Sequence, residues 1–140
     1  MRLSTMLLAL AVLAFAGFLT WSFRAYPGRT TSAQGTTAYD AATEVTLTGT
    51  IKEVKDFACP ESEGTVGTHL LLQTPTGTMQ VHLAPVSLVR SRHLSFVRGE
   101  QITVIGSEVR VFDRRDVLAR EIRRGSETIL IRDWQGKLIE

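Results

Sequence analysis

From Thr43 onward, hydrophobic and polar residues alternate with a period of two, which predicts β-strands. In the first of these segments, Gly49 is followed by a slip in the phase of the alternation at Val54. This combination is typical of a strand that bulges and bends until its sheet closes on itself. A second segment repeats it around Gly106. Strands are expected at about 45–54, 67–73, 78–84, 99–112, 117–122 and 128–131.

Residues 85–98 lose the alternation and suit one short helix or irregular segment, which begins near Pro85 and ends at Gly99. Three curved strands, a short helical cover and a further hairpin follow the order of an OB-fold, a small and partly open Greek-key barrel. The predicted fold class is therefore all-β, with an OB-fold-like barrel and one short helix. An SH3-like barrel shares most of this pattern and remains the alternative.

The start of the chain has the pattern of a membrane segment. An uncharged apolar run of 18 residues extends from Met6 to Phe23. A membrane-spanning helix needs ~17–25 residues, whereas the apolar region of a cleaved signal peptide has ~7–15. Trp21, Phe23 and Tyr26 lie at the end of the run, where an aromatic belt would meet the membrane surface. The length of the run therefore favours an uncleaved anchor.

This anchor divides the chain into three parts. We expect a signal anchor or transmembrane helix at residues 1–26, a flexible linker rich in Thr, Ser, Gly and Ala at 27–42, and the barrel domain at 43–140. The expected location is the cytoplasmic membrane, crossed once through residues 6–23, with the C-terminal domain exported to the periplasm. The alternative is cleavage of a signal peptide near residues 31–33, which would release a soluble periplasmic protein.

The distribution of charge argues against nucleic acid as the partner. Three of the 16 Lys/Arg precede residue 34 and none of the 14 Asp/Glu does, so the rest of the chain has a net charge of −1. A near-neutral domain exerts little pull on phosphates, and few aromatic side chains are present to stack on bases. Four arginines form a candidate patch for an anionic ligand, although we expect them to belong to a salt-bridged surface: Arg110, Arg114, Arg115 and Arg120.

The sequence contains none of the common catalytic motifs, such as GxSxG, HExxH or a phosphate-binding glycine loop, so we expect no enzyme. The single cysteine, Cys59, excludes an internal disulfide and any CxxC site. It lies in the segment DFACPESEG, where the acidic Glu61 and Glu63 disfavour a reactive thiolate. We expect Cys59 to be a half-buried structural residue. A redox thiol, a soft metal ligand and an intermolecular disulfide are the alternatives.

Two of the three histidines lie in one segment, THLLLQTPTGTMQVHLAP, on either side of a Pro-Thr-Gly turn. If the loop has four residues, Thr74–Gly77, His69 lies opposite His82; a three-residue loop sends the two rings to opposite faces. The four-residue loop also places Leu70 and Leu72 beside the apolar residues of the next strand, so we favour it. His69 and His82 then share the outward, solvent-facing side of the hairpin.

This pairing makes His69 and His82 the candidate metal ligands. Opposed side chains have Cβ atoms ~4.5–5.5 Å apart, which lets both imidazoles reach one ion. Two ligands fill half of a zinc site, and the residues that could supply a third are Cys59, Glu61 and Glu63. We therefore expect an exposed pair without a cofactor, or with at most a weakly bound divalent metal.

Three stretches of the domain, VTLTGTIKEV, TGTMQVHLA and GEQITVIGSEV, resemble the small exported bacterial OB-fold proteins of the BOF-like family. The resemblance covers about residues 43–132 and implies an exported OB-fold domain. Leu71, Leu72 and Gln73 stand where the best-known stress-related branch of that family has an aromatic and an acidic residue. The ligand of that branch is therefore not carried over.

Together these observations predict a membrane-anchored, exported OB-fold module without catalytic activity, which binds another protein or a small ligand on the barrel face. One alternative is a periplasmic metal-handling or redox accessory protein that uses His69 and His82, with Cys59 as a further ligand. The second alternative is an oligonucleotide-binding OB-fold.

The segment IRDWQGKLIE is expected to have a structural role, with Trp134 packed over one end of the barrel.

Overall fold

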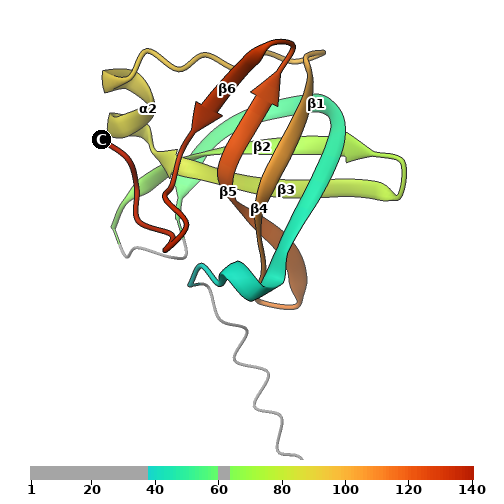
Figure 1. Ribbon diagram of the computed structural model, residues 1–140, viewed down its shortest axis with the longest axis horizontal. Helices are drawn as coiled ribbons and strands as arrows, with labels where there is room; N and C mark the ends of the chain where they lie inside the picture. Colours follow the sequence, from blue (N-terminus) through green and yellow to red (C-terminus); the bar gives the residue numbers. More distant parts are fainter. Residues whose placement is uncertain (1–37, 60–63) are drawn as a thin grey trace, which may run out of the picture. The chain divides into compact units, whose positions relative to one another are not determined.

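The protein is mostly β (Figure 1). The computed structural model describes residues 38–59 and 64–140, and its strands form one six-stranded sheet in the order β3-β2-β1-β4-β5-β6. The expected all-β class with one short α-helix is confirmed for these residues. The elements are η1 (Ala41–Thr43), β1 (Glu44–Ala58), β2 (Val66–Thr74), β3 (Gly77–Pro85), α2 (Val86–Ser91), β4 (Gln101–Val111), β5 (Arg114–Arg124) and β6 (Glu127–Leu130).

A further pairing closes the sheet into a ring. β3 pairs with β5 in parallel over Gln80–His82, whereas the other strand pairs are antiparallel. The strands β1, β2, β3, β5 and β4 therefore enclose a common core, and β6 extends the sheet beyond β5. Leu70, Val81, Val104 and Ile122, one from each of four strands, have 0% exposure inside this ring.

A bulge bends the long strand β1, which curves across the barrel in Figure 1. Its first half, Glu44–Thr50, pairs with β4, and its second half, Thr50–Ala58, pairs with β2. Lys52 is the extra residue opposite β2, two positions before the predicted phase slip at Val54. The bulge expected from the sequence is therefore confirmed, and it turns the second half of β1 over the β2–β3 hairpin.

The β2–β3 hairpin has the predicted register. Gln73 lies opposite Thr78, and Leu70 points into the core. Thr74 and Gly77 also pair, so the turn itself is two residues shorter than the expected loop.

Two predictions about the surface are wrong. The segment 113–116, which the expected strands at 99–112 and 117–122 left as an exposed connection, already belongs to β5 from its second residue, and Asp116 is completely buried. Trp134 is 72% exposed instead of packing over the end of the barrel. Ile131 and Leu138, from the same C-terminal segment, pack against the core in its place.

The predicted membrane helix at residues 1–26 lies outside the described residues, as does most of the expected linker. The described end of that linker, residues 38–42, includes the start of η1, where Asp40 accepts a hydrogen bond from the N–H of Ala42 at 2.9 Å. Within the part of the chain that the structure describes, no helix is long and apolar enough to cross a membrane.

Gly106→Ala should lower the free energy of unfolding by ~3 kcal/mol, because β4 and β5 leave no room for a side chain there. An added Cβ would overlap the carbonyl oxygen of Leu118 and lie 2.9 Å from Cγ1 of Val117. Urea unfolding of this variant measures the effect, with Gln101→Ala, at an exposed position of β4, as the control. Equal stability of both variants would show that the two strands do not approach each other this closely.

Candidate metal centre

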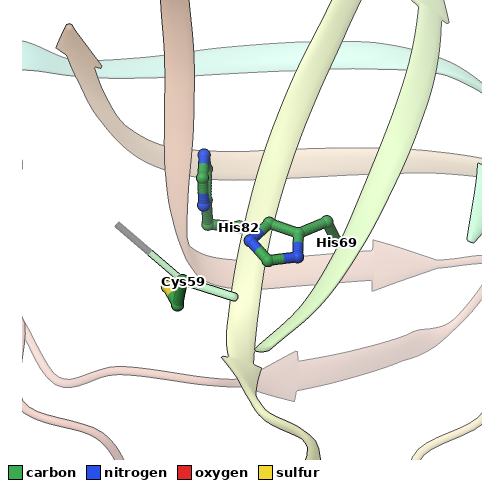
Figure 2. Close-up of side chains that lie close together, drawn as sticks. All are labelled: Cys59, His69 and His82. Atoms are coloured by element: carbon green, nitrogen blue, oxygen red, sulfur yellow. The ribbon is translucent and has the colours of Figure 1, made fainter. Parts of the chain in front are cut away.

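His69 of β2 and His82 of β3 lie directly opposite each other, as the favoured loop predicts. Their ring centroids are 4.5 Å apart and the ring planes meet at 79° (Figure 2). Each residue is only 2% exposed, so the expectation of an exposed pair is wrong. Strand register decided the pairing, whereas the burial comes from other segments that cover the outer side of the hairpin.

Two distant segments provide this cover. Phe57, near the end of β1, stacks on His69 with ring centroids 3.7 Å apart and an angle of 8° between the planes. A cavity of about 60 Å³ borders both histidines, and its lining includes Cys59, Arg132 and Leu138. The histidines therefore lie between the barrel wall and a second layer made by the end of β1 and the C-terminal segment.

Asp116, near the start of β5, orients the ring of His82. Its Oδ2 lies 2.8 Å from Nε2 of His82, and Arg114 donates to both carboxylate oxygens at 2.6 and 2.8 Å. Burial raises the pKa of Asp116, but the hydrogen bonds from Arg114 and His82 outweigh it and hold the pKa below its ordinary value. The ionised carboxylate can therefore accept the Nε2–H of His82, and in the neutral form of this ring the lone pair then lies on Nδ1.

His69 is buried as a neutral imidazole, the form that binds metal ions. Neither ring nitrogen makes a hydrogen bond of ordinary geometry to any described residue. Burial, followed by the charge of His82, lowers the pKa of His69 to about 4, and backbone groups of Gly67 and Lys55 oppose this shift only in part. The ring is therefore neutral at physiological pH and keeps a lone pair that a metal ion can accept.

Cys59 completes the cluster. One ligand atom from each of Cys59, His69 and His82 lies within 4.8 Å of the others (Figure 2). The N–H of Cys59 donates to the carbonyl oxygen of Thr65 at 2.8 Å, which holds the thiol beside the start of β2. Cys59 is half-buried, as expected. Glu61 and Glu63, the other third ligands considered from the sequence, lie outside the described residues.

The three residues fit one transition-metal ion. Zinc–sulfur and zinc–nitrogen bonds of ~2.3 and ~2.1 Å place neighbouring donor atoms about 3.5 Å apart, so side-chain adjustments of about 1 Å would close the cluster on an ion. Arg132 is also buried and donates to the carbonyl oxygens of Leu83 and Ala119, both at 2.6 Å. A cation that lines the same cavity lowers the cost of a thiolate at Cys59.

Four residues around the cluster were not found from the sequence: Phe57, Gln80, Asp116 and Arg132. Asp116 could have been found, because alternation carried back from Leu118 places it on the same face of β5. For Arg132 no comparable signal exists, since its contacts depend on where the C-terminal segment crosses the barrel.

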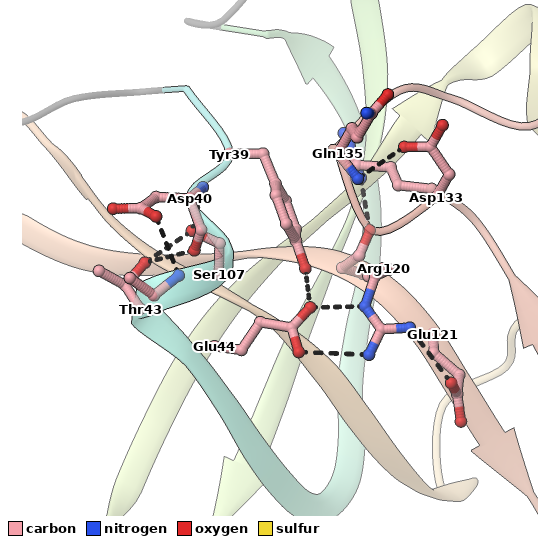
Figure 3. A network of polar contacts seen from close by, with 12 residues as sticks. Tyr39, Asp40, Thr43, Glu44, Ser107, Arg120, Glu121, Asp133 and Gln135 are labelled. Carbon is pink, nitrogen blue, oxygen red and sulfur yellow. Dashed lines mark hydrogen bonds and ion pairs between the residues drawn. The ribbon is translucent and has the colours of Figure 1, made fainter.

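The four arginines of the candidate anionic patch do not form one site of free charges. Arg114 is bound to Asp116, and Arg115 lies 3.7 Å from Glu108. Arg120 donates to Glu44 at 2.5 and 3.2 Å, and Tyr39 donates to the same carboxylate (Figure 3). Arg110 lies opposite Arg115 on the exposed side of β4. A salt-bridged surface accounts for three of the four, and an anion-binding role stays a prediction.

The fold and the site define a class of protein: a small closed β-barrel domain with a Cys/His/His cluster in which both histidines are buried. Residues 43–129, more than half of the chain, match the MamS/MamX magnetosome protein family. The chain belongs to that family. Comparison with curated proteins gives no match.

The family match corrects the resemblance drawn from the sequence. The chain matches the MamS/MamX family and not the BOF-like family of small exported OB-fold proteins, so that assignment is wrong. The stretches that carried the resemblance consist of alternating strand residues with glycines in the middle. Any strongly curved strand in a small barrel needs these features, so they reflect barrel geometry and do not identify a family.

Proposed function

We propose that this domain binds one transition-metal ion through Cys59, His69 and His82. The observation that carries the proposal is the convergence of one ligand atom from each residue within 4.8 Å. Thiolate and imidazole are typical ligands of zinc and copper ions. The description of the family as magnetosome proteins supports a role for this metal-binding domain in the magnetosome.

The energetics of His69 support the same proposal. A buried polar atom without a hydrogen bond costs about 1–3 kcal/mol. Both ring nitrogens of His69 are buried, and among the described residues only the backbone groups of Gly67 and Lys55 approach them, without ordinary hydrogen-bond geometry. A metal ion bound to one of them offsets this cost. An aliphatic side chain of similar size would fill the same space without it.

The contact between His82 and Asp116 supports a metal site as well. Metal-ligating histidines commonly donate their second ring N–H to a carboxylate, which orients the ring and makes the ligand nitrogen more basic. The 2.8 Å contact from Nε2 of His82 to Asp116 has this form and supports Nδ1 as the ligand atom of His82.

The wider setting of the domain belongs to the proposal too. The ring order β1-β2-β3-β5-β4, with α2 between the third and fourth strands, supports an OB-fold. The apolar run at residues 6–23 supports a single membrane anchor with the barrel on the exported side. We propose a binding role without catalysis for the domain in this setting.

A second candidate function is recognition of a protein or small ligand on the barrel face. An open groove of about 530 Å³ lies beside the second half of β1 and supports this role. Its lining combines apolar Val54, Phe96 and Val97 with charged Lys52 and Arg98. This groove is separate from the metal cluster, so the two functions are compatible.

Calorimetric titration of the full-length chain with Zn²⁺, after purification without a chelator or a polyhistidine tag, tests the metal-binding proposal. We expect one ion per chain, and a loss of affinity of at least about 100-fold in Cys59→Ser and in His69→Leu, because each removes one of three ligands. His93→Asn is the matched control, since asparagine tolerates the positive φ of 53° at this position outside the cluster. Equal affinities in all four proteins would contradict the proposal.

A further inference from the structure

We infer that the cluster is a mononuclear copper site, with Cys59, His69 and His82 as three strong ligands in a plane and the side-chain amide of Gln80 as a weak axial ligand. This inference rests on the proposed function and narrows it to one metal and one coordination geometry. A cysteine and two histidines in a trigonal arrangement, with a distant axial group, are typical of copper sites that carry out electron transfer.

The number of ligands favours copper over structural zinc. Structural zinc sites use four protein ligands in a tetrahedron. Among the described residues, Cys59, His69 and His82 are joined by no fourth histidine, cysteine or carboxylate in the cluster. Asp116 is the nearest candidate by position, but both of its carboxylate oxygens are engaged by Arg114 and His82. Within residues 38–59 and 64–140, the cluster therefore offers three strong ligands.

Gln80 provides the weak fourth ligand. It precedes His82 by two positions in β3, which places both side chains on the same face, and it pairs with Asp116 in β5. Together with Phe57 and His69 it lines a cavity of about 80 Å³. Its Nε2 atom is buried and makes no hydrogen bond to any described residue.

The amide of Gln80 can present its oxygen atom to a metal ion. The two ends of a glutamine amide have nearly the same shape, so a rotation of the group brings Oε1 to the position of Nε2. Glutamine oxygen is one of the weak axial ligands found in trigonal copper sites. After this rotation Oε1 of Gln80 and a ring nitrogen of His69 can bind the same ion.

Charge and solvent exclusion favour copper as well. In the reduced state, a Cu⁺ ion and one thiolate form a neutral pair, whereas Zn²⁺ and one thiolate carry a net charge of +1, as Cu²⁺ and one thiolate do, which costs more to bury. Phe57 covers His69 from the solvent side at 3.7 Å between ring centroids. This contact shields one face of the His69 imidazole from solvent, which favours a ligand shell with few water molecules.

Spectroscopy of the copper-loaded protein tests this inference, because most nitrogen and sulfur sites bind Cu²⁺ more tightly than Zn²⁺ and affinity alone is not diagnostic. Full-length protein is loaded with Cu²⁺ under anaerobic conditions, and visible absorption and electron paramagnetic resonance spectra are recorded. We expect an intense thiolate-to-copper charge-transfer band, which Cys59→Ser abolishes and His93→Asn leaves unchanged. Anaerobic addition of one equivalent of Cu⁺ should displace bound Zn²⁺ completely.

Variants of Gln80 test the axial position. Gln80→Met should shift the charge-transfer band and the copper hyperfine splitting, while Gln73→Ala, at an exposed position of the neighbouring strand, should leave both unchanged. Identical spectra for wild type and Gln80→Met would overturn the axial role. Tight Zn²⁺ binding without a charge-transfer band on Cu²⁺ loading would overturn the copper inference and leave the proposed function intact. Absence of binding for both ions would overturn both.

Discussion

Metal-free protein should lose about 3 kcal/mol of its free energy of unfolding as the pH falls from about 6.5 to about 4, and His69 should account for this loss. Burial, with a further contribution from the charge of His82, lowers the pKa of His69 from 6.5 to about 4. Below about 6.5 the unfolded chain binds a proton at this ring, whereas the folded protein does not until about 4. The stabilisation is therefore complete above the upper value and is lost toward the lower one.

Urea unfolding of wild type and His69→Leu in the presence of a chelator, at about pH 7 and about pH 4.5, measures this effect. Leucine fills the space of the imidazole and cannot bind a proton, so the variant should show almost no change in stability over this range. His93→Asn should behave like wild type. The prediction fails if His69→Leu and wild type lose the same free energy on acidification.

Asp116→Ala should lower the free energy of unfolding by ~3 kcal/mol, because it leaves the buried N–H of His82 without an acceptor and creates a small cavity. Asp116 is 0% exposed, and its carboxylate joins Arg114 and His82. Asp116→Asn should keep most of the stability, since the amide oxygen can still accept from Nε2 of His82. It should nevertheless lower the affinity for Zn²⁺ about 10- to 100-fold, the usual effect of changing a carboxylate behind a histidine ligand.

The control for this pair of variants is Asp113→Asn, which changes an exposed carboxylate in the turn before β5. It should leave both stability and Zn²⁺ affinity unchanged. Loss of stability in Asp116→Asn equal to that in Asp116→Ala would show that the negative charge, and not the hydrogen bond to His82, is what the fold requires. Unchanged Zn²⁺ affinity in Asp116→Asn would show that Asp116 does not orient a metal ligand.

Most of the fold was predictable because its signals are local. Alternation of polar and apolar residues predicted the strands, and the glycine and phase slip near Val54 predicted the bulge in β1. The choice between two hairpin loops was also local, because only one register places Leu70 in the core. The start of β5, before Val117, was harder to predict, since the sequence pattern does not distinguish a buried carboxylate from one in an exposed turn.

The sequence by itself determined that His69 faces His82, because strand register follows from which residues must be buried inside the barrel. Only the tertiary structure decided that this pair is buried and joined by Cys59. That outcome depends on the second half of β1, on Asp116, 34 residues from His82, and on the C-terminal segment that carries Arg132. No local pattern records where such distant segments cross the barrel, because their packing is fixed by the closed sheet as a whole. Local alternation assigns the outer side of the β2–β3 hairpin to solvent, but these distant segments cover that side around His69 and His82 and bury both residues.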